Sequence, residues 1–124
     1  SSTLIGSNRE YVGFREKLTT VGTVSTTTYN LDLSLSNIFD ITLGANVTFT
    51  FTSAPPSGVV GYANVILRQP AVSPGKTASF TNAHYTDGVT PVLSTTANSI
   101  DVISFFTLNG GTYWFGAFSM ANVS

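Results

Sequence analysis

Apolar and polar residues alternate along most of this chain, and the clearest alternation predicts a β-hairpin within residues 98–120. The run Ile100–Thr107 places apolar side chains on both faces of an extended strand, and so does the return run Thr112–Phe118. Between them, Asn109-Gly110-Gly111 supplies residues that tolerate the positive φ of hairpin turns. Strands that are apolar on both faces are normally covered on both sides. We therefore expect the hairpin at the centre of a sandwich or at a subunit contact.

The remaining alternation predicts shorter strands separated by turn signals such as Ser36-Asn37 and Gly44-Ala45-Asn46. These strands are expected over residues 9–20, 29–34, 39–43, 47–52, 59–69 and 76–81. No segment of useful length has helical spacing. About eight short strands with a turn signal roughly every 8–12 residues are typical of all-β sandwiches and barrels. We predict an all-β fold, an antiparallel sandwich of about eight strands that is jelly-roll-like.

The domain organisation follows from length and local composition. Residues 1–8 are small and polar and are interpreted as a flexible arm, or as an arm that orders on a neighbouring subunit. Residues 9–124 are predicted to form a single β-sandwich domain, a size that supports one hydrophobic core.

The chain is poor in charge, and this limits its partners. Charged residues make up 9% of the sequence, against a usual share of about 25%. We expect part of the surface to face other protein, although a surface coated with Ser and Thr hydroxyls is the alternative. A net charge of −1 without a basic cluster argues against nucleic acid. No apolar run is long enough to span a membrane, and no cysteine is present for a disulfide or thiolate site.

The few charges are concentrated near the start of the chain. Residues 9–17 hold five of the eleven charged side chains, so we predict a partner interface there. Its candidate residues are Arg9, Tyr11, Arg15 and Lys17. The alternative is a solvated edge strand whose charges prevent unwanted pairing.

Candidate catalytic chemistry is sparse. His84 lies in a polar loop with Asp87 and is a possible general base or metal ligand. One histidine with one nearby aspartate falls short of a zinc or calcium ligand set, so a solvated loop histidine is the favoured interpretation. We assign no catalytic residue, metal site or cofactor. Asp40 and Asp101 are expected on outward strand faces, although Asp101 shares its face with apolar residues and suits a paired or capping role.

Aromatic residues offer a second kind of site. Four are candidates for stacking against sugar rings: Tyr62, Tyr85, Tyr113 and Trp114. Aromatic side chains also dominate protein cores and interfaces, and for the run Tyr113–Phe115 that interpretation is favoured.

Four sequence pieces, in this order, carry a family resemblance: LDLSLSNIFDITLGANVTFTF, APPSG, VILRQ and PVLSTTANSIDVISFFTLNGGTYWFGAF. Together, over residues 29–118, they resemble a module of tailed-bacteriophage virion proteins. That module occurs at the ends of tail-fibre and appendage proteins and in related small structural proteins. The resemblance implies an all-β, oligomeric, non-enzymatic element on the surface of a phage particle. It supplies no catalytic residue.

We therefore expect a structural protein of a tailed-phage virion surface, acting through packing against other virion proteins and copies of itself. Fibre proteins usually carry a long shaft, which this chain lacks, so an appendage module and a capsid decoration protein both remain open. The alternative is a carbohydrate- or receptor-binding module that attaches to a host surface glycan. A small hydrolase using His84 is disfavoured, because no recognisable constellation of catalytic residues accompanies it.

Overall fold

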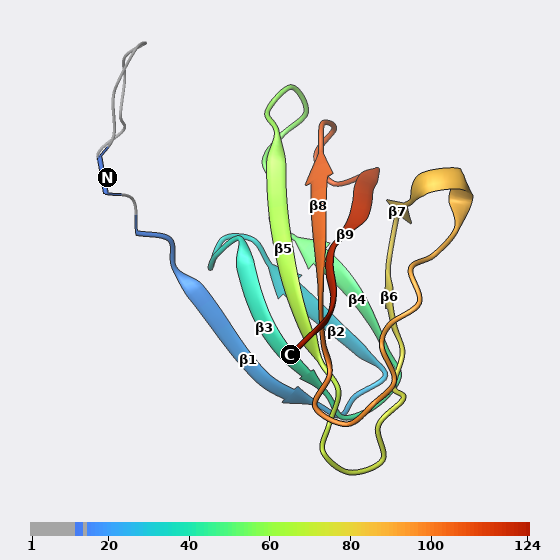
Figure 1. Cartoon of the computed structure of the whole chain (residues 1–124). Coiled ribbons are helices and arrows are strands. Elements are labelled where there is room, and N and C mark those ends of the chain that lie inside the picture. Colours follow the sequence, from blue (N-terminus) through green and yellow to red (C-terminus); the bar gives the residue numbers. More distant parts are fainter. Residues whose placement is uncertain (1–11, 14) are drawn as a thin grey trace.

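The computed structural model describes residues 12–13 and 15–124, whose regular structure consists of β-strands apart from one short 3-10 turn (Figure 1). The strands are β1 (Leu18–Val24), β2 (Thr28–Asp32), β3 (Ile38–Leu43), β4 (Val47–Thr52), β5 (Gly61–Arg68), β6 (Ala78–Phe80), β7 (Ala83–His84), β8 (Ile100–Thr107) and β9 (Trp114–Val123). A 3-10 turn, η1 (Thr86–Gly88), is the only helical element in this part of the chain. The predicted all-β class is confirmed.

The strands form two sheets, and the first six strands belong alternately to one sheet and to the other. One sheet has six strands in the order β1-β3-β5-β8-β9-β7, and the other has three in the order β2-β4-β6. From β1 to β6 the chain alternates between the sheets, and neighbouring strands within each are parallel. Leu18 pairs with Ile38 and Thr28 with Thr48, so the first coil takes about 20 residues. This segment is a stack of three coils, each with one strand in either sheet.

Stacking of successive coils aligns like residues into ladders. Phe49 of β4 stacks on Phe80 of β6 with ring centroids 5.2 Å apart. On the opposite face of the small sheet, the hydroxyl of Thr48 lies 3.0 Å from that of Ser79, and Thr50 lies 3.0 Å from Thr81. The strict alternation of Val47–Thr52 therefore places aromatic rings in the core and hydroxyl groups outside.

The last two long strands form the predicted hairpin. β8 pairs antiparallel with β5 and with β9, so the hairpin extends the six-stranded sheet beyond the coils. Gly110 and Gly111 have φ of 74° and 86°, the conformation for which glycine suits this turn. The side-chain oxygen of Asn109 accepts a hydrogen bond from the Tyr113 amide at 3.1 Å, which closes the turn.

An aromatic cluster joins the two sheets. Phe51 of the small sheet lies 5.1 Å from the ring of Phe105 and 4.6 Å from that of Trp114. Phe80 lies 4.7 Å from Phe105. These contacts continue into one hydrophobic core of buried residues from both sheets. The core therefore lies between the inner faces of the sheets, and the hairpin contributes two of its largest rings.

The predicted antiparallel order is wrong for five of the seven strand pairings among the described residues, which are parallel. Period-two alternation identifies strands that have one buried face, but it is the same for both directions of pairing. Parallel neighbours need a crossover of about a dozen residues, and here the strand of the opposite sheet lies within it. The jelly-roll order is not confirmed.

The strand predicted over residues 9–20 is also misplaced. Residues 12, 13 and 15–17 belong to no strand, and β1 begins only at Leu18. The side chains of Arg15, Glu16 and Lys17 are exposed. Their alternation with apolar residues therefore does not correspond to a buried strand face. The predicted arm, residues 1–8, lies outside the described residues.

Asp101 faces the interior rather than the solvent, contrary to the simpler expectation. Its carboxylate is 1% exposed and accepts hydrogen bonds from the Ser94 amide at 2.7 Å, the Ser94 hydroxyl at 2.8 Å and the Asn122 amide at 2.9 Å. It therefore ties the approach to β8 to the end of β9, the capping role that its apolar neighbours suggested. Asp40 lies on the outward face, as expected, and pairs with Arg68.

We predict that Asp101→Asn lowers the free energy of unfolding by about 1–3 kcal/mol, because the new amide group would leave the N–H of Ser94 or of Asn122 without the acceptor that the buried carboxylate supplies. Asp40→Asn makes the same chemical change at a partly exposed ion pair and is expected to cost less than about 1 kcal/mol. Urea denaturation of both variants measures the difference. Equal losses would contradict the role given to Asp101.

Candidate functional site

The outer face of the six-stranded sheet, opposite the core, is largely apolar. Buried positions of β3, β5 and β8 alternate with half-buried or exposed positions that define this face. Its apolar members are Ile38, Tyr62, Ile66, Ile100, Val102, Phe106, Phe115, Ala117 and Met120. The hairpin is thus covered by the core on one side and presents an apolar surface on the other.

Aromatic rings form a strip across one end of this face. Strand register places Tyr62 of β5 beside Phe106 of β8, and Phe106 beside Phe115 of β9. The Phe106 and Phe115 rings stack at 4.6 Å with an angle of 11° between their planes. Tyr113 continues the strip 4.9 Å from Phe115, and His84 stacks on Tyr113 at 3.7 Å. We call these five residues the aromatic strip.

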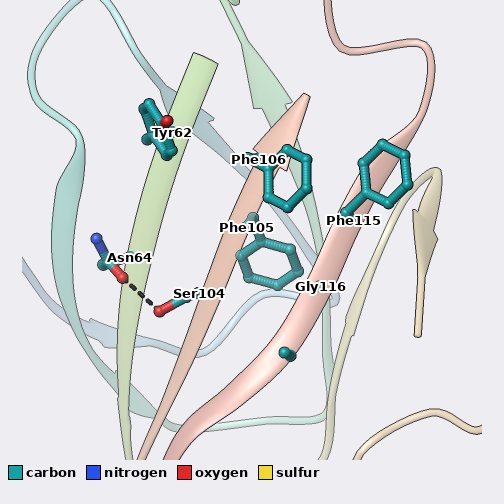
Figure 2. A pocket seen from close by; sticks show the side chains of 8 residues that line it. Tyr62, Asn64, Ser104, Phe105, Phe106, Phe115 and Gly116 are labelled. Carbon is teal, nitrogen blue, oxygen red and sulfur yellow. Dashed lines mark hydrogen bonds between the residues drawn. The ribbon is translucent and has the colours of Figure 1, made fainter. Parts of the chain in front are cut away.

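A hollow of about 400 Å³ lies beside the strip (Figure 2). Tyr62, Phe106 and Phe115 line it together with small residues such as Ala117. Within it the Ser104 hydroxyl donates a 2.6 Å hydrogen bond to the side-chain oxygen of Asn64 and also contacts the Ser119 hydroxyl. The hollow therefore combines aromatic walls with polar groups that already bind one another.

The charges on this face neutralise each other. Arg68 of β5 donates two hydrogen bonds to the Asp40 carboxylate of β3, at 2.7 and 3.0 Å. The hydrogen bond to Asp40 raises the pKa of Arg68, so the guanidinium stays charged. The pair presents no net charge to a partner.

Two of the four predicted stacking residues lie on the strip. Tyr62 is 60% exposed and Tyr113 is 39% exposed. Trp114 was a wrong candidate, because it points into the core and is 1% exposed. Tyr85 packs against the inner side of β9, with its ring 6.4 Å from that of Phe105, and burial raises its pKa to about 12. The structure therefore does not join these four residues into one platform.

Arg15 and Lys17, the two predicted partner residues that the structure describes, do not lie at the strip. Arg15 and Lys17 are exposed and precede β1, an edge strand of the sheet separated from β9 by three others. Arg9 and Tyr11 lie outside the described residues. A contact through this charged segment stays a prediction.

Sequence reasoning missed Phe106 and Phe115 as site residues. Alternation correctly placed Phe106 with Val102, and Phe115 opposite Trp114. What it lacked was the register that brings Tyr62, Phe106 and Phe115 into one row. The Asn109–Gly111 turn indicated that β8 pairs with β9, and so that Phe106 lies near Phe115. No local sequence pattern indicates that β5 pairs with β8, because the two strands lie far apart in the sequence.

The described residues contain no group of three or more His, Cys, Asp or Glu side chains that could hold a metal ion. His84 is exposed and stacks face to face on Tyr113. Within the same part of the chain, no helix is long and apolar enough to cross a membrane. No protein-family model, curated protein or solved structure matches this chain.

The burial of Tyr85 predicts a pH effect on stability. Its pKa in the folded protein is about 12, above the ordinary value near 10, so the folded state disfavours the phenolate. Its contribution is complete below pH 10 and is lost as pH rises from about 10 to 12. Chemical denaturation across this range should show a smaller fall in Tyr85→Phe than in the wild type. Identical curves would contradict this account.

Proposed function

We propose that this chain is a non-enzymatic structural protein of a tailed-phage virion surface, and that it works by packing its outer face against other virion protein. The observation that carries the packing role is the six-stranded sheet that is apolar on both faces, of which the core covers only one. The phage setting rests on the sequence resemblance over residues 29–118. An appendage module and a capsid decoration protein both fit this role.

The composition of the outer face supports protein packing. Protein interfaces are rich in aromatic residues and methionine and poor in unpaired charge. Phe106, Phe115 and Met120 are 38%, 40% and 57% exposed. Contiguous exposed apolar surface of this kind marks interaction sites in soluble proteins. Because the only charges among the outward positions of β3, β5 and β8 pair with each other, covering this face leaves no charge unpaired.

Burial of this face against a partner would also stabilise the folded chain within the assembly. Each apolar side chain removed from water contributes roughly 25 cal/mol per Å² of surface buried. A partner that binds only the folded chain raises its stability by mass action. The exposed face therefore gains its stabilising effect only when the particle assembles.

We predict that Phe115→Lys weakens association without unfolding the chain, because it places a charge in the middle of the aromatic strip. Val72→Lys is the matched control, since Val72 is 80% exposed in the loop between β5 and β6. Sedimentation velocity over a range of concentrations measures self-association, and thermal unfolding of dilute protein checks the fold. Wild type that stays monomeric and does not bind virion particles would contradict the proposal.

Carbohydrate binding is a second candidate, favoured by the exposure of Tyr62 beside the hollow that contains Asn64 and Ser104. A sugar ring against Tyr62 would meet both an aromatic surface and polar groups. We expect a glycan array to give a signal that Tyr62→Ala removes and Val72→Ala retains, if this function holds. No signal from the wild type would exclude it for the glycans tested.

A further inference from the structure

The turn between β8 and β9 contains a chemically reactive pair of residues. Asn109-Gly110 is the only asparagine in the sequence that is followed by glycine. Both residues are exposed, and glycine has no side chain to shield its own backbone nitrogen. Among the residues that the structure describes, no hydrogen bond uses the Gly110 N–H. This nitrogen is therefore accessible to water and lies next to the side-chain amide of Asn109.

The turn holds the Asn109 side chain by its carbonyl oxygen. Oδ1 of Asn109 accepts hydrogen bonds from the Thr107 hydroxyl at 3.2 Å and from the Tyr113 N–H at 3.1 Å. Thr107 is fully buried, and its hydroxyl also accepts a hydrogen bond from the Gly111 N–H at 3.0 Å. Donors fixed at a carbonyl oxygen stabilise the negative charge that develops there when the carbon is attacked. The turn therefore supplies Asn109 with the equivalent of an oxyanion hole.

Asn46 has a similar carbonyl contact but lacks an accessible nitrogen beside it. Its Oδ1 accepts a hydrogen bond from the Thr77 N–H at 2.9 Å. The next residue is Val47, which is buried and whose N–H donates to the Thr77 carbonyl at 3.0 Å. A branched side chain and a hydrogen bond thus both protect the nitrogen of Val47. Asn46 is therefore an internal control for the chemistry of Asn109.

We propose that Asn109 is a site of spontaneous deamidation, which the hairpin turn promotes. The Gly110 nitrogen gives its proton to water or hydroxide, and its lone pair forms a bond to Cγ of Asn109. The tetrahedral intermediate carries its negative charge on Oδ1 and expels the side-chain nitrogen as ammonia, which leaves a five-membered succinimide ring. Water then opens the ring at either carbonyl and gives aspartate or isoaspartate. Water is the only co-reactant, and nothing is oxidised or reduced.

The product places a negative charge at the end of the aromatic strip. Asn109 lines a hollow of about 250 Å³ together with Leu108, Tyr113 and Phe115. A carboxylate that loses its water there must find a new partner, because an unpaired buried charge is costly. Isoaspartate also adds one carbon atom to the main chain of the turn. This consequence rests on the proposed packing role: deamidation limits the time for which an unassembled chain keeps its outer face able to pack.

Mass spectrometry of peptides from the incubated chain tests the modification directly, because deamidation replaces a side-chain NH₂ by OH. We expect Asn109 to convert at least about tenfold faster than Asn46 in the same folded sample at mildly alkaline pH. We also expect Asn109 to convert faster in the folded chain than in urea, where the turn and its two donors are lost. Faster conversion in urea would show that the turn protects Asn109, and would overturn the proposal.

Two variants of Thr107 test the part played by its hydroxyl. Thr107→Val removes the donor and should slow conversion of Asn109 by about tenfold, whereas Thr107→Ser retains it and should react like the wild type. Thermal unfolding checks that both variants fold, and the comparison in urea decides the question if Thr107→Val does not. Equal rates in the two folded variants would overturn the role of the hydroxyl.

Sedimentation velocity tests the consequence for packing separately. We expect Asn109→Asp to self-associate more weakly than the wild type, and Val72→Asp, which places the same charge in the loop between β5 and β6, to behave like the wild type. Unchanged association of Asn109→Asp would overturn the consequence for packing. A wild type that neither self-associates nor binds virion particles would remove the proposed function, whereas conversion of Asn109 is measured by mass in either case.

Discussion

The contact of Phe51 and Phe80 with Phe105 and Trp114 holds this fold together. Phe51 and Phe80 belong to the stacked coils, whose strands pair in parallel. Phe105 and Trp114 belong to the hairpin, whose strands pair antiparallel, so the contact joins these two segments. Coils of a parallel stack mainly contact their immediate neighbours and depend on what covers the last one. Here β8 pairs with the last strand of the coils in the large sheet, while its Phe105 covers the small one. The hairpin therefore closes the stack through both its backbone and its side chains.

This closure determines what the hairpin presents to the outside. Inward positions are occupied by Ile103, Phe105 and Trp114, which the core needs. A soluble end piece would place polar residues at the alternate positions. Instead these positions carry Phe106, Phe115 and other apolar groups. The core accounts for only one face, and the apolar side chains of the second face are the basis for proposing that it packs against other protein.

Much of the fold was predictable from local pattern. Val47–Thr52 appeared as a strand with the observed bounds, and the Asn109–Gly111 turn identified the hairpin. The alternation also assigned Phe105 and Phe106 to opposite faces. These features depend on side chains within a few residues of each other, and period-two spacing records them directly.

Pairing over long distances in the chain was not predictable in the same way. Nothing local distinguishes a strand that crosses to a second sheet from one that turns back in a hairpin. The ladder of Phe49 on Phe80 depends on coils that differ in length because of their loops. Trp114 illustrates the consequence for the site: its residue type suited a stacking platform, but only the position of the small sheet shows that Phe51 already covers it.

The positions of the charged and polar side chains help to distinguish sugar binding from protein contact at the aromatic strip. Asp32 ends β2 and Lys76 precedes β6, both strands of the three-stranded sheet, and Asp87 lies in η1, so none of them occupies a strand position of the outer face. On that face Arg68 donates two hydrogen bonds to the Asp40 carboxylate, and the Ser104 hydroxyl donates one to the side-chain oxygen of Asn64. A sugar site requires polar groups that are free to bind hydroxyls, whereas a protein contact requires polar groups that lose nothing when water leaves. The Asp40 carboxylate and the Asn64 side-chain oxygen already accept hydrogen bonds from neighbours on this face, so these acceptors favour contact with protein over contact with sugar hydroxyls.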